Sequence, residues 1–159
     1  MPQSRRPQSR RVDVIVNRCA HRLAGDSRAR ASLVEASRGL AEVHETGSVA
    51  ELESVVRQIE GRGTDAVILA GGDGSYMAGT TALVRAFGPA MPPVGFAPGG
   101  TVGTVARNWG MHGSDATYGA RVVRAAAAST ARVTKRPTLR VEDEGGAGKV
   151  GFIFGTGLV

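Results

Sequence analysis

The sequence predicts an α/β protein: a doubly wound, mostly parallel sheet with helices on both faces, followed by the start of an incomplete antiparallel β region. Short, nearly unbroken apolar segments alternate with segments whose apolar residues recur at helical spacing. Strands that are apolar on both faces are typical of parallel sheets covered by helices. After residue 130 the alternation stops, and short strand candidates follow one another with only turns between them.

The first half of the chain supplies two strand–helix pairs. The β-branched run Val12–Val16 is typical of a buried strand. Residues 26–41 carry one apolar face among many charges, which predicts a surface helix, and residues 42–45 are a weaker strand candidate. Ser48 and Glu51 have the spacing of a capping box, and an apolar stripe at helical spacing follows them. A second helix is therefore expected after Ser48.

The same pattern continues toward residue 130. Residues 65–70 are expected to form a buried strand, and residues 94–97 form another after a pair of prolines. Helices are expected at residues 75–87, from residue 101 to about residue 110, and over the alanine-rich segment 114–128.

The residues after 130 have a different sequence pattern. Residues 131–136, 139–142 and 149–154 are short strand candidates, and the acidic, glycine-rich segment between the last two is typical of a hairpin connection. We therefore expect three parts. They are a basic disordered tail over residues 1–11, an α/β nucleotide-binding domain over residues 12–130, and the truncated beginning of a β-rich second domain over residues 131–159.

The composition indicates a soluble protein. The length of 159 residues suits one α/β domain with a fragment of another, and 42% hydrophobic residues can build a core. The single cysteine, Cys19, excludes an internal disulfide and fits a reducing compartment. The chain has neither the roughly 20 apolar residues of a membrane span nor an apolar signal core at its N-terminus. A cytoplasmic protein is expected, either free or peripheral to the membrane.

The positive charge is concentrated at the N-terminus. The formal charge is +6, and residues 1–11 hold four arginines and no acid, which leaves +2 for the rest of the chain. Such a tail is most simply a solvated arm, and an anionic membrane surface is a candidate partner for it. Nucleic acid is not an expected partner, because no aromatic residue interleaves the arginines to stack on bases.

Three glycines surround one carboxylate at the end of the strand predicted at residues 65–70. The amides of Gly71, Gly72 and Gly74 can approach a phosphate closely because no Cβ atoms intervene, and the following helix adds its positive end. Phosphate repels Asp73, so we expect this candidate catalytic residue to interact with Mg²⁺ or to orient a hydroxyl. Ser75 would donate a hydrogen bond or cap the helix. The alternative is a turn that serves tight packing alone.

A second glycine-rich loop follows the next strand, over residues 98–103. Thr101 offers a hydroxyl and a helix start, although an ordinary N-cap would look the same. Loops at neighbouring strand ends of a parallel sheet meet at one edge, where ligands bind in α/β proteins. The two loops are therefore expected to face one nucleotide-binding cleft.

Other motifs are weaker. Residues 146–151 match the dinucleotide fingerprint G-x-G-x-x-G, but they precede a strand instead of linking a strand to a helix. No P-loop signature is present, and His21, His44 and His112 lack metal-ligand spacing. No set of metal ligands is predicted.

Several of these motifs, in this order and spacing, resemble the catalytic region of the diacylglycerol kinase family, within the superfamily that also holds sphingosine kinases and NAD kinases. The resemblance covers residues 12 to about 110, with a further similar segment at 152–157. It is carried by Val14-Ile-Val-Asn17, Thr46, Gly71-Gly-Asp-Gly-Ser75, and Pro98-Gly-Gly-Thr101 continuing to Ala106-Arg107. The resemblance implies that Asn17, Thr46, Gly72 to Ser75 and Thr101 line an ATP site, and that ATP with Mg²⁺ donates a phosphoryl group to the hydroxyl of a lipid alcohol.

The chain departs from the family pattern at two places. Asn17-Arg18 replaces the usual Asn-Pro, and Gly103 and Thr104 stand where the family has Asn and Asp, which removes a carboxylate. In the family a β-rich second domain completes the cleft. The chain by itself is therefore expected to be inactive, and its unpaired strands are expected to favour homo-oligomers.

Two alternative functions stay open. A non-catalytic nucleotide-binding module would explain the missing carboxylate. A phosphofructokinase-like sugar kinase shares a similar Gly-Gly-Asp-Gly-Ser loop, although its glycine-rich loop after the first strand is absent here, where Asn17-Arg-Cys-Ala stands. For a lipid kinase the acceptor is open among diacylglycerol, a sphingoid base and other polyol lipids.

Overall fold

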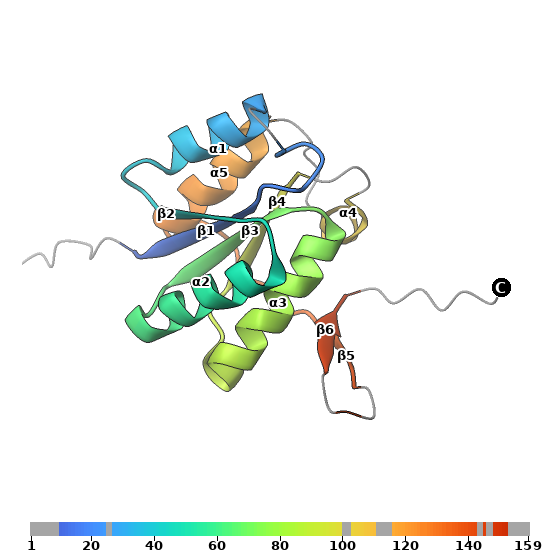
Figure 1. The fold of residues 1–159 in the computed structure, drawn as a ribbon. Coiled ribbons are helices and arrows are strands. Elements are labelled where there is room, and N and C mark those ends of the chain that lie inside the picture. Colours follow the sequence, from blue (N-terminus) through green and yellow to red (C-terminus); the bar gives the residue numbers. More distant parts are fainter. Residues whose placement is uncertain are drawn as a thin grey trace, which may run out of the picture.

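The structure, a computed structural model, describes residues 10–24, 27–99, 103–110, 116–142, 145 and 148–152. Its centre is a four-stranded parallel sheet in the order β2-β1-β3-β4 (Figure 1). The strands are β1 (Val12–Asn17), β2 (Glu42–Thr46), β3 (Ala66–Gly71) and β4 (Val94–Pro98). The predicted parallel sheet is confirmed, and each predicted strand end lies within one residue of the observed one.

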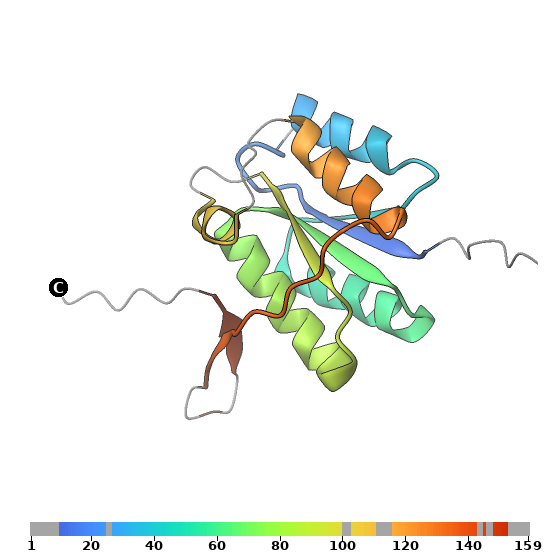
Figure 2. The same cartoon turned by 180° about the vertical axis from the view of Figure 1, so that it is seen from behind.

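Helices cover both faces of the sheet. In the two opposite views, α1 and α5 lie side by side over one face, and α2 and α3 lie over the other (Figure 1; Figure 2). The helices are α1 (Arg28–Ser37), α2 (Val49–Arg62), α3 (Asp73–Phe87), the 3-10 helix η1 (Gly88–Ala90), α4 (Thr104–Asn108) and α5 (Ala116–Ala127). Among the helices that the structure describes, none is long and apolar enough to cross a membrane.

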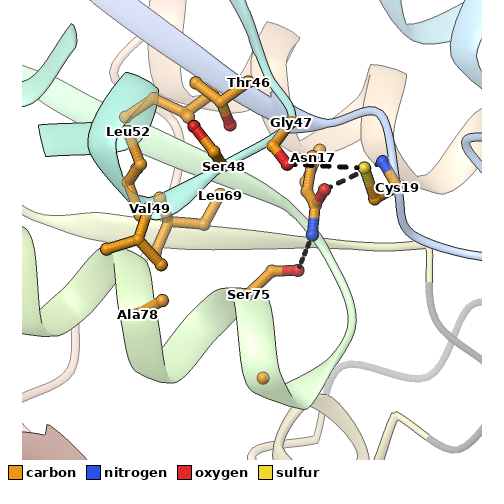
Figure 3. A pocket seen from close by; sticks show the side chains of 13 residues that line it. Asn17, Cys19, Thr46, Gly47, Ser48, Val49, Leu52, Leu69, Ser75 and Ala78 are labelled. Atoms are coloured by element: carbon orange, nitrogen blue, oxygen red, sulfur yellow. Dashed lines mark hydrogen bonds between the residues drawn. The ribbon is translucent and has the colours of Figure 1, made fainter. Parts of the chain in front are cut away.

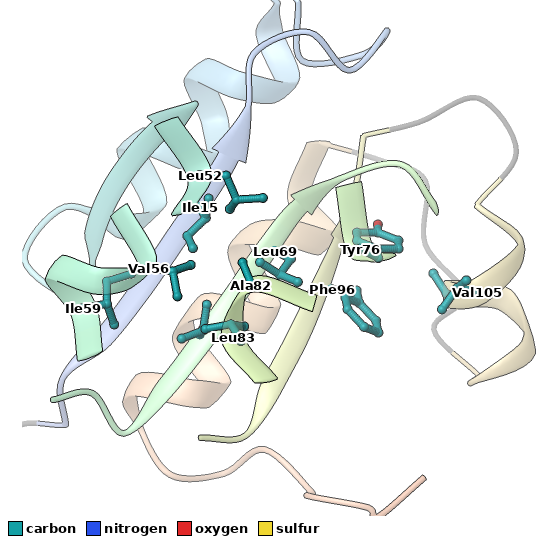
Figure 4. Close-up of a cluster of buried hydrophobic side chains, with 12 residues drawn as sticks. Ile15, Leu52, Val56, Ile59, Leu69, Tyr76, Ala82, Leu83, Phe96 and Val105 are labelled. Atoms are coloured by element: carbon teal, nitrogen blue, oxygen red, sulfur yellow. The ribbon is translucent and has the colours of Figure 1, made fainter. Parts of the chain in front are cut away.

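The alternation of side chains along β1 divides the core between the two faces. Val14 points to one face and packs in a cluster with Leu33 of α1 and Val123 of α5. Ile15 points to the other face and packs in a cluster with Leu52 of α2 (Figure 4). The apolar strand needs both helix layers, because each face would otherwise be exposed to water.

Two helix starts differ in how they are capped. The hydroxyl of Ser48 accepts the amide of Glu51, as the capping box predicts, but the Glu51 carboxylate accepts the amide of Gly47 at 2.8 Å instead of that of Ser48. Helix α3 was expected to begin at Ser75 and begins at Asp73. Gly72 is its N-cap, without a side-chain hydrogen bond. The prediction was wrong because a glycine-rich run offers no capping signal of its own.

Beyond α5, β5 (Leu139–Val141) and β6 (Lys149–Gly151) form an antiparallel hairpin. This confirms the antiparallel β region expected after residue 130. The hairpin lies against α3, where the Thr81 hydroxyl donates to the carbonyl of Val150 at 3.0 Å and accepts its amide at 2.9 Å. The strand expected at residues 131–136 is wrong. Those residues are exposed and extend past β4 without a ladder partner among the described strands (Figure 2).

Aromatic rings join the hairpin and α4 to the sheet. The ring centroid of Phe96 in β4 lies 4.4 Å from that of Tyr76, 5.4 Å from that of Trp109 and 5.5 Å from that of Phe152. Tyr76 is fully buried, and this burial raises the pKa of its hydroxyl well above the ordinary value. Tyr76 therefore stays neutral and acts as a packing residue at the start of α3.

Candidate functional site

A cavity of about 250 Å³ opens at the carboxyl ends of β1, β2 and β3, between the first turns of α2 and α3 (Figure 3). This is the edge at which α/β sheets bind their ligands. The cavity contains four of the residues that the sequence singled out: Asn17, Thr46, Gly74 and Ser75. The end of β1, the end of β2 and the glycine loop after β3 thus meet at one cavity. The role of these residues in binding ATP stays a prediction.

Asn17 connects the end of β1 to the first turn of α3 inside the cavity. Its side-chain amide donates to the Ser75 hydroxyl at 2.8 Å, and its carbonyl oxygen accepts the backbone amide of Cys19 at 2.9 Å. The Ser75 oxygen is thus an acceptor toward Asn17, and its own proton remains available to a ligand. The Thr46 hydroxyl donates to the carbonyl of Val16 only at 3.5 Å, the long end of the hydrogen-bond range.

Two glycines of the loop have different physical roles. A Cβ atom on Gly71 would lie 2.4 Å from the Ser75 hydroxyl oxygen and 2.5 Å from its Cβ, so any larger residue there would force the turn to shift. A Cβ atom on Gly74 would meet no atom within 4 Å. Gly71 is therefore required by the protein's own packing, whereas Gly74 leaves open space at the amino end of α3.

Asp73 lies on the other side of this loop. Its carboxylate accepts the amides of Thr104 at 2.9 Å and Val105 at 3.2 Å, so the side chain caps α4. It lines a second cavity, of about 260 Å³, together with the apolar side chains of Met77, Val105 and Phe152. Gly74 lines both cavities, which places the loop between them. The catalytic role predicted for Asp73 stays a prediction.

The second glycine-rich loop lies beside the first. The amide of Gly99 donates to the carbonyl of Gly71 at 2.7 Å, and the amide of Arg22 donates to the carbonyl of Gly99 at 2.9 Å. Gly103, at the other end of this loop, is left-handed with φ +60°. Thr101 lies outside the described residues.

Sequence reasoning missed the contribution of α2. Gly47 and Ser48 line the cavity next to Thr46, and Cys19 lines it from the loop after β1. A hydrogen bond from the Gly47 amide, followed by the Arg18 charge, lowers the pKa of Glu51. The capping box was a usable signal, because a helix that starts directly after β2 must begin at the same edge as the glycine loop.

The floor of the cavity is apolar. Ile15, Leu52 and Leu69 contribute to it from β1, α2 and β3. An apolar floor beneath a few convergent polar groups is the usual composition of a small-molecule site. The amino termini of α2 and α3 open into the same space, and their positive ends favour an anion.

Comparison with known proteins agrees with this arrangement. Residues 11–135 match the family described as diacylglycerol kinase catalytic domain, and the chain belongs to that family. No curated protein matches the sequence.

Solved structures share the fold. A diacylglycerol kinase from Bacillus anthracis str. Sterne is 20% identical, with a TM-score of 0.59 over 75% of this chain and 43% of that one. Two proteins provisionally assigned as diacylglycerol kinases from the same organism are also 20% identical. Their TM-scores are 0.59 and 0.61, over 76% and 75% of this chain and 44% and 42% of theirs. The chain thus spans less than half the length of these proteins.

The residues at the site fit ATP with Mg²⁺. The open space at Gly74 and the free proton of Ser75 suit a phosphate group, and the apolar floor suits a nucleobase. Asp73 is a carboxylate at the edge of the loop, and Mg²⁺ is typically held by one or two carboxylates with phosphates and water. Within the described residues, one group offers three candidate metal ligands, Asp13, Glu42 and His44. It lies at the amino ends of β1 and β2, far from the glycine loops, and Arg62 already pairs with both of its acids.

Proposed function

We propose that this domain binds ATP with Mg²⁺ in the cavity between α2 and α3, and that the protein transfers the γ-phosphate to the hydroxyl of a lipid alcohol. The observation that carries the proposal is the hydrogen bond between Asn17 and Ser75 beside the open amino end of α3. It joins the end of β1 to the glycine loop and leaves the Ser75 hydroxyl proton available beside the open space at Gly74.

Each site residue has a role in this proposal. The amide of Gly74 and the hydroxyl of Ser75 bind phosphate oxygens, and the floor made by Leu52 and Leu69 receives the base. Thr46 contributes its hydroxyl from the end of β2. When bound, Mg²⁺ would neutralise part of the phosphate charge. Phosphoryl transfer depends mainly on this neutralisation and on positioning of the reactants.

The second cavity supports a lipid acceptor. Its apolar side chains, Met77, Val105 and Phe152, lie beside Asp73 and across Gly74 from the proposed phosphate site. An alcohol whose hydroxyl lies near Asp73 would place its hydrocarbon part against these side chains. A lipid acceptor also makes contact with a membrane surface a natural part of the proposal, and the basic residues 1–11 would add attraction to anionic lipid.

Calorimetric titration with ATP and Mg²⁺ tests the binding step. We expect saturable binding by residues 1–159 that weakens about 10- to 100-fold in Asn17→Ala or Ser75→Ala, because each change removes a hydrogen bond near a charged group. The surface change Lys135→Ala is the control and should leave the affinity unchanged. If Asn17→Ala and Ser75→Ala bind ATP as tightly as Lys135→Ala does, the nucleotide binds elsewhere.

The transfer step needs a longer form of the protein, because the known structures of similar fold are more than twice as long as the matched region. Residues 1–159 alone are expected to bind without transfer and to self-associate through the hairpin edge. The longer form should consume ATP with a lipid alcohol and not with fructose 6-phosphate. Turnover with the sugar phosphate would support a phosphofructokinase-like reaction and overturn the proposed acceptor.

A non-catalytic nucleotide-binding module is the second candidate. It is favoured by the two amides that already occupy the Asp73 carboxylate and by the absence of an acid at Gly103 and Thr104. The two candidates differ in the longer protein. Nucleotide binding without any ATP-dependent phosphorylation of lipid alcohols would support the module.

A further inference from the structure

A groove of about 410 Å³ lies at the opposite end of the sheet from the nucleotide cavity. Its floor includes Ala66 and Ile68 at the start of β3, and Val94 and Gly95 at the start of β4. Because the strands are parallel, their first residues lie at the edge opposite to the glycine loops. The described residues that line this groove include none of those that line the nucleotide cavity.

One wall of the groove is apolar and is formed by Val122, Ala125 and Ala126 of α5. The other wall belongs to the segment that extends past β4 (Figure 2), and its lining residues are Ala131, Arg132, Val133, Thr134 and Arg136. Val133 is 64% exposed within this segment, so an apolar side chain stays in contact with water beside an apolar floor. A ligand with a hydrocarbon part would remove that contact.

Three arginines give the groove a positive rim. Arg10, Arg132 and Arg136 line it and are exposed, and the described lining residues include no acid. In the part of the chain that the structure describes, none of these three side chains makes an ion pair. A cluster of uncompensated guanidinium groups attracts an anion and binds a carboxylate through two parallel hydrogen bonds.

We propose that this groove binds a monomeric anionic amphiphile with a single hydrocarbon chain and a terminal carboxylate, which is the chemistry of a fatty acid. The apolar floor receives the chain, and the arginine rim receives the carboxylate. The volume lies in the range of about 300–1,000 Å³ that small-molecule sites occupy. The site is separate from the proposed nucleotide cavity, and its existence does not depend on the kinase activity.

The chain carries its own reporter for this site. Trp109 is the one tryptophan of the sequence, and it lines the groove. Titration with decanoate, kept below its micelle concentration, should change the Trp109 fluorescence with one saturable transition. The neutral 1-decanol and the cationic decyltrimethylammonium ion have the same chain, and we expect both to bind at least about tenfold more weakly.

Charge variants test the rim. The double change Arg132→Gln and Arg136→Gln should weaken decanoate binding on the order of 10- to 100-fold, because two charge-assisted contacts are lost. Lys135→Gln is the matched control, since Lys135 lies in the same exposed segment without lining the groove. It should leave the affinity unchanged, and neither variant should alter ATP binding.

Several results would overturn the inference. One is the absence of any saturable fluorescence change with decanoate. Another is equal binding of decanoate and 1-decanol, or equal weakening by Lys135→Gln. Binding only to vesicles containing phosphatidylglycerol, and not to monomeric decanoate, would assign the arginines to a membrane surface. Tighter binding of an acidic extended peptide than of decanoate would assign the groove to strand addition at the free edge of β4.

Discussion

Asp73 caps a helix other than its own: its carboxylate accepts the backbone amide of Thr104 at 2.9 Å, at the start of α4. Asp73 is the first residue of α3, directly after the glycine loop, whereas Thr104 follows the second loop. The side chain therefore ties together two segments that converge only in the folded protein. These hydrogen bonds fix the position from which Asp73 would act at the proposed site.

Replacing Asp73 should loosen α4 first. Asp73→Ala removes the acceptor of two amides, and the loss of a capping side chain costs about 0.5–2 kcal/mol of stability. Asp73→Asn keeps one acceptor oxygen, so we expect a smaller loss. Hydrogen exchange followed by NMR should show faster exchange of the Thr104 and Val105 amides in Asp73→Ala than in Asp73→Asn. Unchanged exchange in Asp73→Ala would show that these hydrogen bonds do not hold α4.

The two loop glycines should respond differently to alanine. Gly71→Ala places a Cβ atom 2.4 Å from the Ser75 hydroxyl oxygen, and overpacking of this kind costs about 1–3 kcal/mol. Gly74→Ala meets no protein atom and lies in a helix, where alanine is favoured by about 0.5–1 kcal/mol.

Gly74→Ala should have opposite effects on stability and on ATP affinity. If the phosphates of ATP approach the loop as proposed, the new methyl group of Gly74→Ala lies in their path. We expect Gly74→Ala to unfold at a higher temperature than the wild type and yet to bind ATP more weakly in calorimetric titration. A variant that gains stability and keeps full affinity would argue against phosphate binding at this loop.

The sheet was predictable because its signals are local. Apolar runs such as Val12–Val16 and the capping pair Ser48 and Glu51 specify a strand and a helix start without reference to the rest of the chain. The start of α3 was not predictable in the same way, since Gly72 caps it without a side chain. The expected strand at residues 131–136 failed because strand formation needs a partner, which sequence pattern alone does not supply.

The candidate site was predictable in part for the same reason. Asn17 and Ser75 follow strands that must end at one edge of a parallel sheet, so their proximity could be anticipated. The hydrogen bonds of Asp73 to α4 could not be anticipated from the sequence, because they depend on how the second loop folds back. The groove rimmed by Arg132 and Arg136 also escaped prediction, since it arises where residues 131–136 extend past β4.

Acid should destabilise the protein through Asp13. Its side chain is fully buried at the start of β1 and contacts His44 at 2.8 Å and Arg62. Burial alone would raise the pKa of Asp13, but the hydrogen bond with His44 and the Arg62 charge outweigh it and lower the pKa. A lowered folded-state pKa means that the contribution to stability is present above the ordinary value of 3.8 and is lost as the pH falls through the folded value.

A comparison with Asp13→Asn isolates this contribution. Urea unfolding at pH 7 should show the variant less stable by about 1–3 kcal/mol, because Arg62 and His44 lose a charged partner. The difference should shrink as the pH falls below 3.8, because the wild-type carboxylate then takes up its proton. Glu42 also pairs with Arg62, and this ion pair is present in both proteins, so its effect largely cancels. A difference that grows toward low pH would contradict the assigned direction of the shift.

Neighbouring threonines in α3 provide a matched test of how the hairpin is attached. The Thr81 hydroxyl makes two hydrogen bonds with the backbone of Val150 in β6, whereas the Thr80 hydroxyl is buried with no partner in the described structure. Thr→Val replaces the hydroxyl with a methyl group of similar size. Thr81→Val leaves the Val150 amide and carbonyl without their partner, and each unsatisfied group costs about 1–3 kcal/mol if it stays buried. Thr80→Val removes a polar group that has no partner, so it should be neutral or stabilising.

The measurement must distinguish release of the hairpin from general destabilisation. Hydrogen exchange at Val150 should accelerate in Thr81→Val, while amides of the central strand β3 keep their protection, because the hairpin can detach without opening the sheet. Thr80→Val should leave both sets unchanged. Uniform acceleration of β3 and β6 in Thr81→Val would show that the hairpin and the sheet unfold as one unit. Equal exchange at Val150 in the two variants would show that the Thr81 hydrogen bonds do not anchor the hairpin to α3.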